Sequence, residues 1–384
     1  MTDWRREAEE IAAELIALRR DFHRYPETGN KEYRTSEVIE TYLKSLGIET
    51  YRPLETGVIG ILRGSSIGKT CAFRSDIDAL PIKENTGLSY ASVNEGIMHA
   101  CGHDIHMSAL LGAAKLLSIH RDTLKGTVIF IFQPDEEESG GAERLIKAGI
   151  IEKADAVFGC HVNPDLPVGT CGIRYGSFYA SAAKYDVTVH GKASHGAEPE
   201  NGIDALYSAA EMCRKLKTLS GRYDEGRAVV TTGILTAGTA RNIIADTARF
   251  SGIIRTETPQ LRTLLKEKVR SVIEETDERH GTVSEAEICD GYCGIVNHDA
   301  ETEHVQKCAE ALLGREYTIL LAEGTMTTED FGFYLLKKPG CYYHLGVQSR
   351  AGLHSAQFDP DERSIACGAA LHAYVIFAYL NHKA

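Results

Sequence analysis

The sequence predicts an α/β protein with a mixed, mainly parallel sheet, into which a second, α+β unit is inserted. Short and nearly uninterrupted runs of β-branched and aromatic residues, such as residues 127–132 (TVIFIF), are typical of strands buried on both faces of a parallel sheet. From Lys184 the pattern changes to the order β-α-β-β-α-β, which is the split βαβ arrangement of ferredoxin-like units. A further buried strand follows near the C-terminus. We therefore expect residues 1–180 and 292–384 to form one domain and residues 181–291 a second, inserted one.

The first predicted domain begins with two helices. Apolar residues recur at helical spacing through residues 4–22, which predicts one amphipathic helix. A second helix is expected over residues 35–46, where Gly47 ends it. The buried strands expected in this part are residues 71–75, 127–132 and 156–160.

The inserted unit and the C-terminal part follow from the same periodicity signals. The strands expected in the inserted unit are residues 185–189, 228–235, 248–254 and 282–288, and its helices are residues 204–219 and 261–279. The elements expected after it are a helix at residues 300–313, a strand at residues 341–347 and a last helix from Ser364.

Side chains that bind metal ions gather near the predicted strand ends. The segment 99–104 (HACGHD) places a thiol and two imidazoles beside a glycine, and these groups are ligands for zinc and related ions. Gly102 has no Cβ, which we expect to allow a close approach of the backbone to an ion. In open α/β sheets, ligands bind outside the carboxyl ends of the strands. The residues that follow the four buried strands are Asp76 and Asp78, Glu136 and Glu137, His161, and His354.

The composition excludes several classes of protein. The 384 residues are 43% hydrophobic and 25% charged, which is enough for two domains with their own cores. A net charge of −12 without a basic run argues against nucleic acid as the main partner. The N-terminus lacks the apolar region of a secretory signal, and the purely apolar runs are shorter than a membrane span. Ten scattered cysteines suit a reducing compartment, so we expect a soluble, cytoplasmic protein that does not bind membranes.

These residue types predict a two-metal hydrolytic site. Five donors are available for metal ions: Cys101, His103, Glu137, His161 and His354. One tetrahedral ion with an open position needs fewer. In two-metal sites the ions acidify a water molecule and polarise a carbonyl group. The other glutamate of the pair, Glu136, is then suited to take the proton from that water and pass it to the leaving nitrogen.

The motifs of the chain resemble those of one known family. They are residues 74–81 (RSDIDALP), 99–104 (HACGHD), 132–137 (FQPDEE), 159–161 (GCH), 191–195 (GKASH), 328–331 (TEDF) and 353–354 (LH). Together, and over nearly the whole chain, they resemble the amidohydrolase branch of the aminoacylase and carboxypeptidase metallopeptidase family. Hippurate hydrolases, auxin-conjugate hydrolases and N-acetyldiaminopimelate deacetylases belong to it. The resemblance implies a metallopeptidase-like catalytic domain with an inserted domain that acts as a lid and mediates dimerisation.

The resemblance also implies roles for single residues. Cys101 would bridge two metal ions, the other four donors would complete the two shells, and Glu136 would be the general base. His195 would reach the substrate carbonyl oxygen, and Asn242 falls where family members contact substrate. Arg241 is a cation suited to a substrate carboxylate, on residue type alone.

Two acidic residues depart from the pattern of the resembled family. Asp135 stands where alanine is usual, and Glu138 stands where glycine is usual. They would alter the metal preference or the charge of accepted products if they face the site, and have no such effect if they face solvent. Cys160 stands where leucine is common, and strand alternation points it away from His161 and toward the packed interior.

Several of these residues also have a purely structural interpretation. Asp76 and Asp78 either orient a histidine or serve the fold alone. In the structural interpretation, the hydrogen bonds of the His195 ring are satisfied by the backbone of its own loop, and Arg241 and Asn242 are turn residues.

The favoured function is a metal-dependent amidohydrolase that cleaves N-acetyl, N-benzoyl or similar small N-acyl amino acids. Two divalent ions are expected, manganese or zinc first, with cobalt and nickel also compatible. A homodimer or higher homo-oligomer through the inserted domain is expected.

Three alternatives remain open. A small peptidase or dipeptidase of the same family is one. A thiol enzyme with Cys101 as nucleophile and His103 or His99 as base would leave His354 without a role. A non-catalytic module would bind metal without turnover.

Overall fold

The computed structural model describes residues 2–381 of the chain, which form two compact units. Unit 1 comprises the chain up to Gly176, Asn297–Ala322 and the chain from Phe333 onward; unit 2 comprises Ser177–Val296 and Glu323–Gly332. The sequence places the boundaries at 180/181 and 291/292. It gives no sign that Glu323–Gly332 groups with unit 2, because that segment contains no clear strand or helix pattern. Thr325 nevertheless donates its N–H to the Phe178 carbonyl at 2.8 Å.

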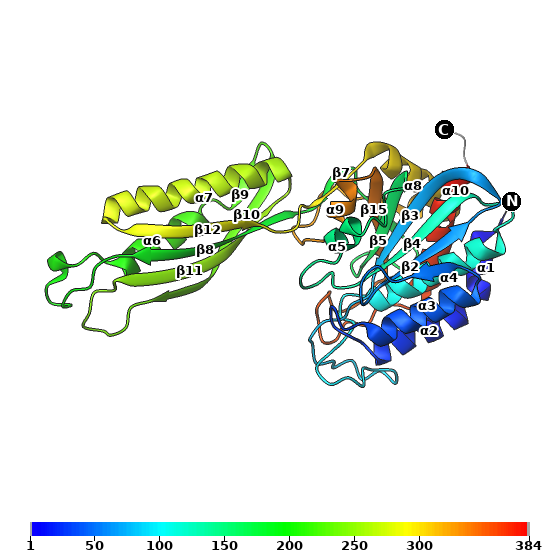
Figure 1. Ribbon diagram of the computed structural model, residues 1–384, viewed down its shortest axis with the longest axis horizontal. Helices are drawn as coiled ribbons and strands as arrows, with labels where there is room; N and C mark the ends of the chain where they lie inside the picture. The colour runs from blue at the N-terminus through cyan, green and yellow to red at the C-terminus, as the bar shows by residue number, and fades with distance from the viewer. Residues whose placement is uncertain (1, 382–384) are drawn as a thin grey trace. The chain divides into compact units, whose positions relative to one another are not determined.

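Unit 1 is built on a mixed sheet of eight strands in the order β1-β2-β4-β3-β5-β15-β6-β14 (Figure 1). The strands are β1 (Glu49–Tyr51), β2 (Val58–Arg63), β3 (Ser66–Asp76), β4 (Lys125–Gln133), β5 (Ala156–Asn163), β6 (Cys171–Ile173), β14 (Thr318–Leu320) and β15 (Gly340–Gly346). The central strands β4, β3, β5 and β15 are parallel, whereas β1 and β2 are antiparallel to their neighbours. The predicted α/β fold with a mixed, mainly parallel sheet is confirmed. A two-stranded sheet pairs β7 (Gly176–Tyr179) with β13 (Ile295–Asn297).

Helices pack on this sheet and complete the core of unit 1. They are α1 (Trp4–Glu10), α2 (Ala12–Arg24), α3 (Tyr33–Ser45), α4 (His103–Ile119), α5 (Ala142–Lys147), α8 (Asp299–Leu312), α9 (Gly332–Leu335) and α10 (Arg363–Asn381), with a 3₁₀ turn at Arg315–Tyr317. The single helix predicted for residues 4–22 was wrong, since the chain breaks at Ile11 into α1 and α2. No glycine or proline marks this break, so periodicity alone could not reveal it.

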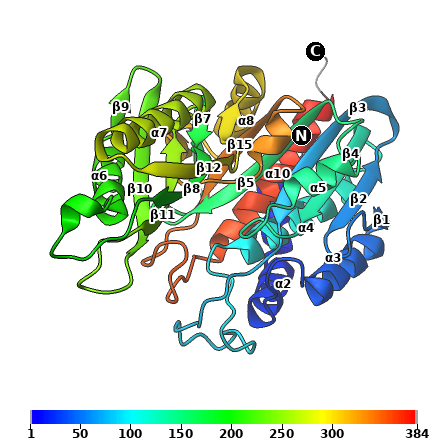
Figure 2. The same cartoon turned by 60° about the vertical axis from the view of Figure 1, so that its left-hand side comes forward.

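Helix α10 runs beside α4 over the sheet (Figure 2). By length and composition α10 could cross a membrane. This was not expected from the sequence, because the uninterrupted apolar runs are shorter. However, 67% of its apolar window is buried inside the fold. The apolar side chains of α10 therefore pack in the core of unit 1, where α4 is also buried along nearly its whole length.

Unit 2 is an antiparallel sheet in the order β12-β8-β11-β10-β9 with α6 and α7 packed on it (Figure 1). Its elements are β8 (Ser181–His190), α6 (Ala205–Lys217), β9 (Gly221–Tyr223), β10 (Gly226–Ala237), β11 (Thr247–Thr256), α7 (Pro259–His280) and β12 (Val283–Asp290), with a 3₁₀ turn at Pro199–Asn201. The predicted β-α-β-β-α-β order is confirmed, with the short β9 added. Thr258 caps α7 before Pro259, and Gly281 ends it in the left-handed conformation.

Acid sensitivity of the fold is expected from a histidine in α10. His372 is buried, and its Nδ1 lies 2.6 Å from the Tyr343 hydroxyl. Burial lowers the pKa of His372 to about 3, whereas an unfolded chain titrates near 6.5. Between about pH 6.5 and 3 the unfolded chain therefore binds a proton that the folded chain does not, so this contribution to stability is present above pH 6.5 and lost as the pH falls.

We expect His372→Gln to make the acid-side fall in the midpoint of thermal unfolding shallower than in the wild type. Thermal unfolding followed by circular dichroism at several pH values between 7 and 4 measures this slope. An unchanged slope would mean that His372 is not a source of the acid sensitivity.

Candidate metal centre

The carboxyl ends of three parallel strands meet at one edge of the sheet in unit 1. In the strand register Asp76 lies opposite Gln133, and Arg74 lies opposite Gly159. The glutamate pair follows the end of β4, as predicted, with Pro134 and Asp135 between. Two expected positions differ slightly: Asp76 is the last residue of β3, and His161 lies inside β5, because both strands continue beyond their most apolar stretch.

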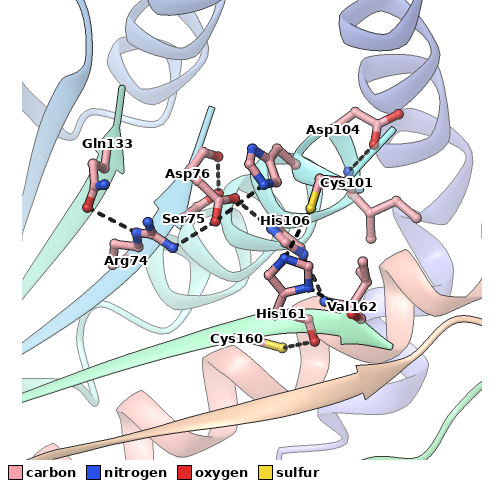
Figure 3. Close-up of polar contacts among 12 residues, drawn as sticks. Arg74, Ser75, Asp76, Cys101, Asp104, His106, Gln133, Cys160, His161 and Val162 are labelled. Carbon is pink, nitrogen blue, oxygen red and sulfur yellow. Dashed lines mark hydrogen bonds and ion pairs between the residues drawn. The ribbon is translucent and has the colours of Figure 1, made fainter. Parts of the chain in front are cut away.

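The structure brings the five predicted metal donors together in unit 1. Cys101, His103 and His161 each offer a donor atom within 4.8 Å of one another, and so do Cys101, Glu137 and His354. The Cys101 Sγ lies 3.4 Å from the His161 Nε2, as the close-up shows (Figure 3). The His354 Nε2 lies 3.3 Å from a Glu137 carboxylate oxygen. Cys101 is thus the one predicted donor shared by both groups.

Backbone carbonyls fix the ring orientation of two of these histidines. The Nδ1 of His103 lies 2.8 Å from the Asp78 carbonyl, and the Nδ1 of His161 lies 2.8 Å from the Val162 carbonyl. A carbonyl can only accept a hydrogen bond, so each Nδ1 carries a proton and Nε2 is the ring nitrogen that remains for a ligand. His354 stands in the loop after β15 with a φ of 61°, and its N–H donates to the Ala100 carbonyl at 2.8 Å.

A buried network surrounds the donors at the end of β3 (Figure 3). Val162 donates its N–H to the His106 Nε2 at 2.9 Å, so the other ring nitrogen of His106 carries the proton and donates to Asp76 at 2.6 Å. Arg74 donates to the same carboxylate at 2.7 Å. Because both nitrogens of His106 are engaged, this ring orients its neighbours and does not offer a ligand atom.

The start of α4, which carries His103, is held by a second buried network. The Asp104 carboxylate accepts hydrogen bonds from the Arg19 Nε and the His23 Nδ1, both at 2.8 Å. Gly102 precedes the helix with a φ of 83°, and a Cβ there would lie 2.5 Å from Val162. The left-handed turn and the close packing on β5 are therefore structural reasons for a glycine here, while the close approach of the backbone to an ion stays a prediction.

Charges in the site favour the binding of a cation. Burial, with Glu137 and Glu136 nearby, raises the pKa of the Cys101 thiol well above its usual value. Burial opposes charge on His103, but Asp76, Asp78 and Glu137 outweigh it and raise the pKa of His103 to about 10. Burial lowers the pKa of His161 well below its usual value. Without a cation the thiol therefore stays protonated, which argues against Cys101 as an activated nucleophile.

The two acidic residues beside the glutamate pair differ from each other. Glu138 is exposed, whereas Asp135 is fully buried. Asp135 does not face solvent, and its carboxylate is bonded to Asn30, Ser139 and Arg144. Glu136 is buried, and it offers a carboxylate oxygen within 4.8 Å of donor atoms of His103 and Glu137.

The predicted substrate residues of unit 2 lie together in two adjacent loops. His195 forms an isolated bridge with Ile243, and Gly196 donates its N–H to the Asn242 carbonyl at 2.8 Å. Arg241 and Asn242 are exposed. The Ala197 N–H donates to the His195 Nδ1 at 3.1 Å, so one ring nitrogen is satisfied by its own loop and the other carries the proton.

Sequence reasoning missed the supporting residues Arg74 and Arg19. A local signal was available for Arg74, and another marks His106. Arg74 is two residues before Asp76 on β3, so strand alternation puts both side chains on one face. His106 is three residues after His103 on α4, which puts both rings on one face of the helix. The role of Arg19 depends on the packing of α2 against α4, which no local pattern reveals.

The residues present fit a pair of metal ions. The His103 Nε2 is buried and makes no hydrogen bond within residues 2–381. Such buried polar atoms are costly unless a partner binds them. Thiol, imidazole and carboxylate are the donor types of zinc and manganese sites.

The family model described as peptidase family M20/M25/M40 matches residues 72–378 of the chain. This chain belongs to the M20 family. The resemblance expected from the motifs is thereby confirmed, and with it a metal-binding hydrolase.

Three similar proteins illustrate the range of the M20 family. The chain is 37% identical to N-acetyl-L-cysteine deacetylase of Bacillus subtilis (strain 168), with 92% of this chain and 85% of that protein covered. It is 36% identical to thermostable carboxypeptidase 1 of Saccharolobus solfataricus, with 97% of both covered. A solved Bacillus subtilis protein described as a dinuclear metal binding peptidase from the M20 family superposes with a TM-score of 0.88 at 34% identity, covering 97% of this chain and 99% of that one. Family membership and the deacetylase relative identify an enzyme that hydrolyses carbon–nitrogen bonds.

Proposed function

We propose that this protein removes a small acyl group, such as acetyl, from an N-acyl amino acid, using two metal ions held by Cys101, His103, Glu137, His161 and His354. One observation carries the proposal: Cys101 is common to two groups of donors, each compact enough for one ion. The deacetylase activity in the name of one relative supports the substrate class. Bound there, divalent ions would acidify a water molecule and polarise the amide carbonyl.

The protein's own residues supply the proton transfers in this proposal. Glu136 is buried beside the donors and accepts the proton of the attacking water, then delivers it to the leaving nitrogen. The Asp78 carboxylate accepts a hydrogen bond from the Glu137 N–H at 3.0 Å, and the Asp78 backbone carbonyl accepts one from the His103 Nδ1. Asp78 therefore orients two of the proposed metal ligands. Asp76, held by Arg74 and His106, keeps negative charge beside the His103 ring.

We keep His195, Arg241 and Asn242 as proposed substrate contacts. The protonated outer nitrogen of His195 suits a carbonyl oxygen that gains negative charge, and the exposed guanidinium of Arg241 suits a carboxylate. Arg241, Gly238 and Tyr207 also line a hollow of about 450 Å³ within unit 2.

The name of the carboxypeptidase relative supports a second candidate, a peptidase that releases an amino acid from a short peptide. A panel of N-acetyl, N-benzoyl and N-succinyl amino acids and unblocked dipeptides separates the two candidates. Faster turnover of the acyl amino acids by the manganese- or zinc-loaded protein supports deacylation. Turnover confined to dipeptides would replace it with the peptidase.

We also propose that two chains associate through unit 2. Ile234 and Leu235 of β10 are 61% and 46% exposed, and within the described chain β10 pairs with β9 only over Gly226–Ala228. A long apolar strand edge that is not covered invites pairing with another chain. A second copy of the same strand would cover it with twofold symmetry.

We expect Ile234→Lys to convert the wild-type dimer into a monomer, because the substitution would bury two like-charged lysine side chains, one from each chain, in the interface. Light scattering coupled to size-exclusion chromatography measures the mass against 42.1 kDa per chain. Glu285→Lys, an exposed change on β12 of the same sheet, serves as the control. A monomeric wild type, or a dimer that Ile234→Lys leaves intact, would reject this interface.

The cytoplasmic location stays a proposal that rests on the free cysteines of the described chain.

A further inference from the structure

The loop that carries the glutamate pair is fastened at Asp135. This residue is fully buried and has a φ of 59°, in the left-handed region. Its carboxylate accepts hydrogen bonds from the Asn30 side-chain amide at 2.7 Å and from the Arg144 guanidinium at 2.9 Å. The Ser139 hydroxyl also donates to it. Aspartate is among the few residue types that tolerate this backbone conformation.

The three side chains Asn30, Asp135 and Arg144 form a closed triangle. Arg144 donates to the Asn30 side-chain oxygen at 2.6 Å as well as to Asp135, so each member is bonded to both others. They come from three segments: the loop before α3, the loop after β4, and α5. Gly29 lets the first segment approach closely, because a Cβ there would clash with the Asp135 carboxylate and lie 3.3 Å from its Cα.

Two further hydrogen bonds hold the backbone on either side of Glu136. The Asp135 N–H donates to the buried Glu32 carboxylate at 2.9 Å, and the Glu137 N–H donates to Asp78 at 3.0 Å. The conformation of the loop is thus determined by contacts on both sides of Glu136, while the triangle is the part that ties it to α5.

We propose that the triangle of Asn30, Asp135 and Arg144 is a positioning device that sets the directions of Glu136 and Glu137. It rests on the proposed function, because the gain is metal binding by Glu137 and proton transfer by Glu136. Asp135 itself touches neither the metal donors nor a substrate atom in this account. A carboxylate at this position therefore acts through the backbone of its two neighbours.

The test is the affinity of the metal-stripped protein for Mn²⁺ alone, measured by competition with a chelator, for Asp135→Ala, Asp135→Asn and Arg144→Ala. Loss of groups that orient ligands typically weakens metal affinity by about 10- to 100-fold. We expect that loss in Asp135→Ala and a smaller one in Arg144→Ala, with kcat lowered and KM little changed. Asp135→Asn should recover part of the affinity, since it keeps an acceptor and tolerates the left-handed conformation. Lys147→Ala removes an exposed cation from the same helix and should change nothing.

The double variant Asp135→Ala with Arg144→Ala separates a shared device from independent effects. We expect it to bind Mn²⁺ no more weakly than Asp135→Ala, because the triangle is already open. Additive losses, or Mn²⁺ affinity in Asp135→Ala equal to that of the wild type, would overturn the proposal. So would losses that only follow a fall in the melting temperature of the metal-free protein. A wild type that binds no Mn²⁺ or Zn²⁺ would instead reject the proposed function itself.

Discussion

Glu136→Gln is expected to lower kcat by about 10²- to 10⁴-fold, the range that a positioned general base contributes. Glutamine has nearly the shape of glutamate but cannot accept a proton from water at neutral pH. The metal content should stay at two ions per chain, because Glu136 is not among the proposed ligands. Steady-state turnover of an N-acetyl amino acid, with metal counted by elemental analysis, gives both quantities.

Glu138→Gln is the matched control, since it makes the same change two residues later on an exposed side chain. It should leave kcat within a small factor of the wild type. If Glu136→Gln retained wild-type turnover while Glu138→Gln lost it, the assignment of the base would be wrong. If Glu136→Gln lost its metal together with its activity, Glu136 would be a ligand instead.

Cys101→Ala is expected to remove both ions and all measurable turnover. Its Sγ belongs to both donor groups, so each group loses a donor by one substitution. The loss of affinity should exceed the roughly 10- to 100-fold typical of residues that only orient ligands. Elemental analysis after dialysis against a fixed Mn²⁺ concentration measures the occupancy.

His161→Ala provides the comparison for this variant. His161 belongs to only one of the two groups formed by the predicted ligands, so one ion should be lost more readily than the other. Cys289→Ala, a partly exposed thiol of unit 2, should bind both ions. A Cys101→Ala protein that keeps two ions would remove the shared donor from the account.

The fold and the five donors could be predicted because local signals marked them. Buried strands appear as apolar runs, and all the donors except His354 lie close to a strand end or a helix start, so the topology brings them together. His354 lies in the loop between β15 and α10. His161 illustrates the limit of this reasoning. The apolar run fades at Cys160 while β5 continues to Asn163, so the residue was placed one step outside its strand.

What the sequence could not show depends on contacts between distant segments. Asp135 could be predicted to face either the site or solvent, and it does neither, because Asn30 and Arg144 bind it from other elements. Arg19 is completely buried against Asp104, although arginine on a helix is usually exposed. Long-range partners of this kind carry no periodic signature, so only the folded structure reveals them.

The central claim is that the donors around Cys101 hold two ions that the hydrolysis of an N-acyl amino acid requires. The most direct measurement is a titration of the metal-stripped protein with Mn²⁺, in which bound metal and turnover of an N-acetyl amino acid are followed together. The account predicts no turnover without metal, binding that saturates at two ions per chain, and full turnover only when both are bound. Undiminished turnover in the metal-stripped protein, or full turnover with a single bound ion, would contradict it.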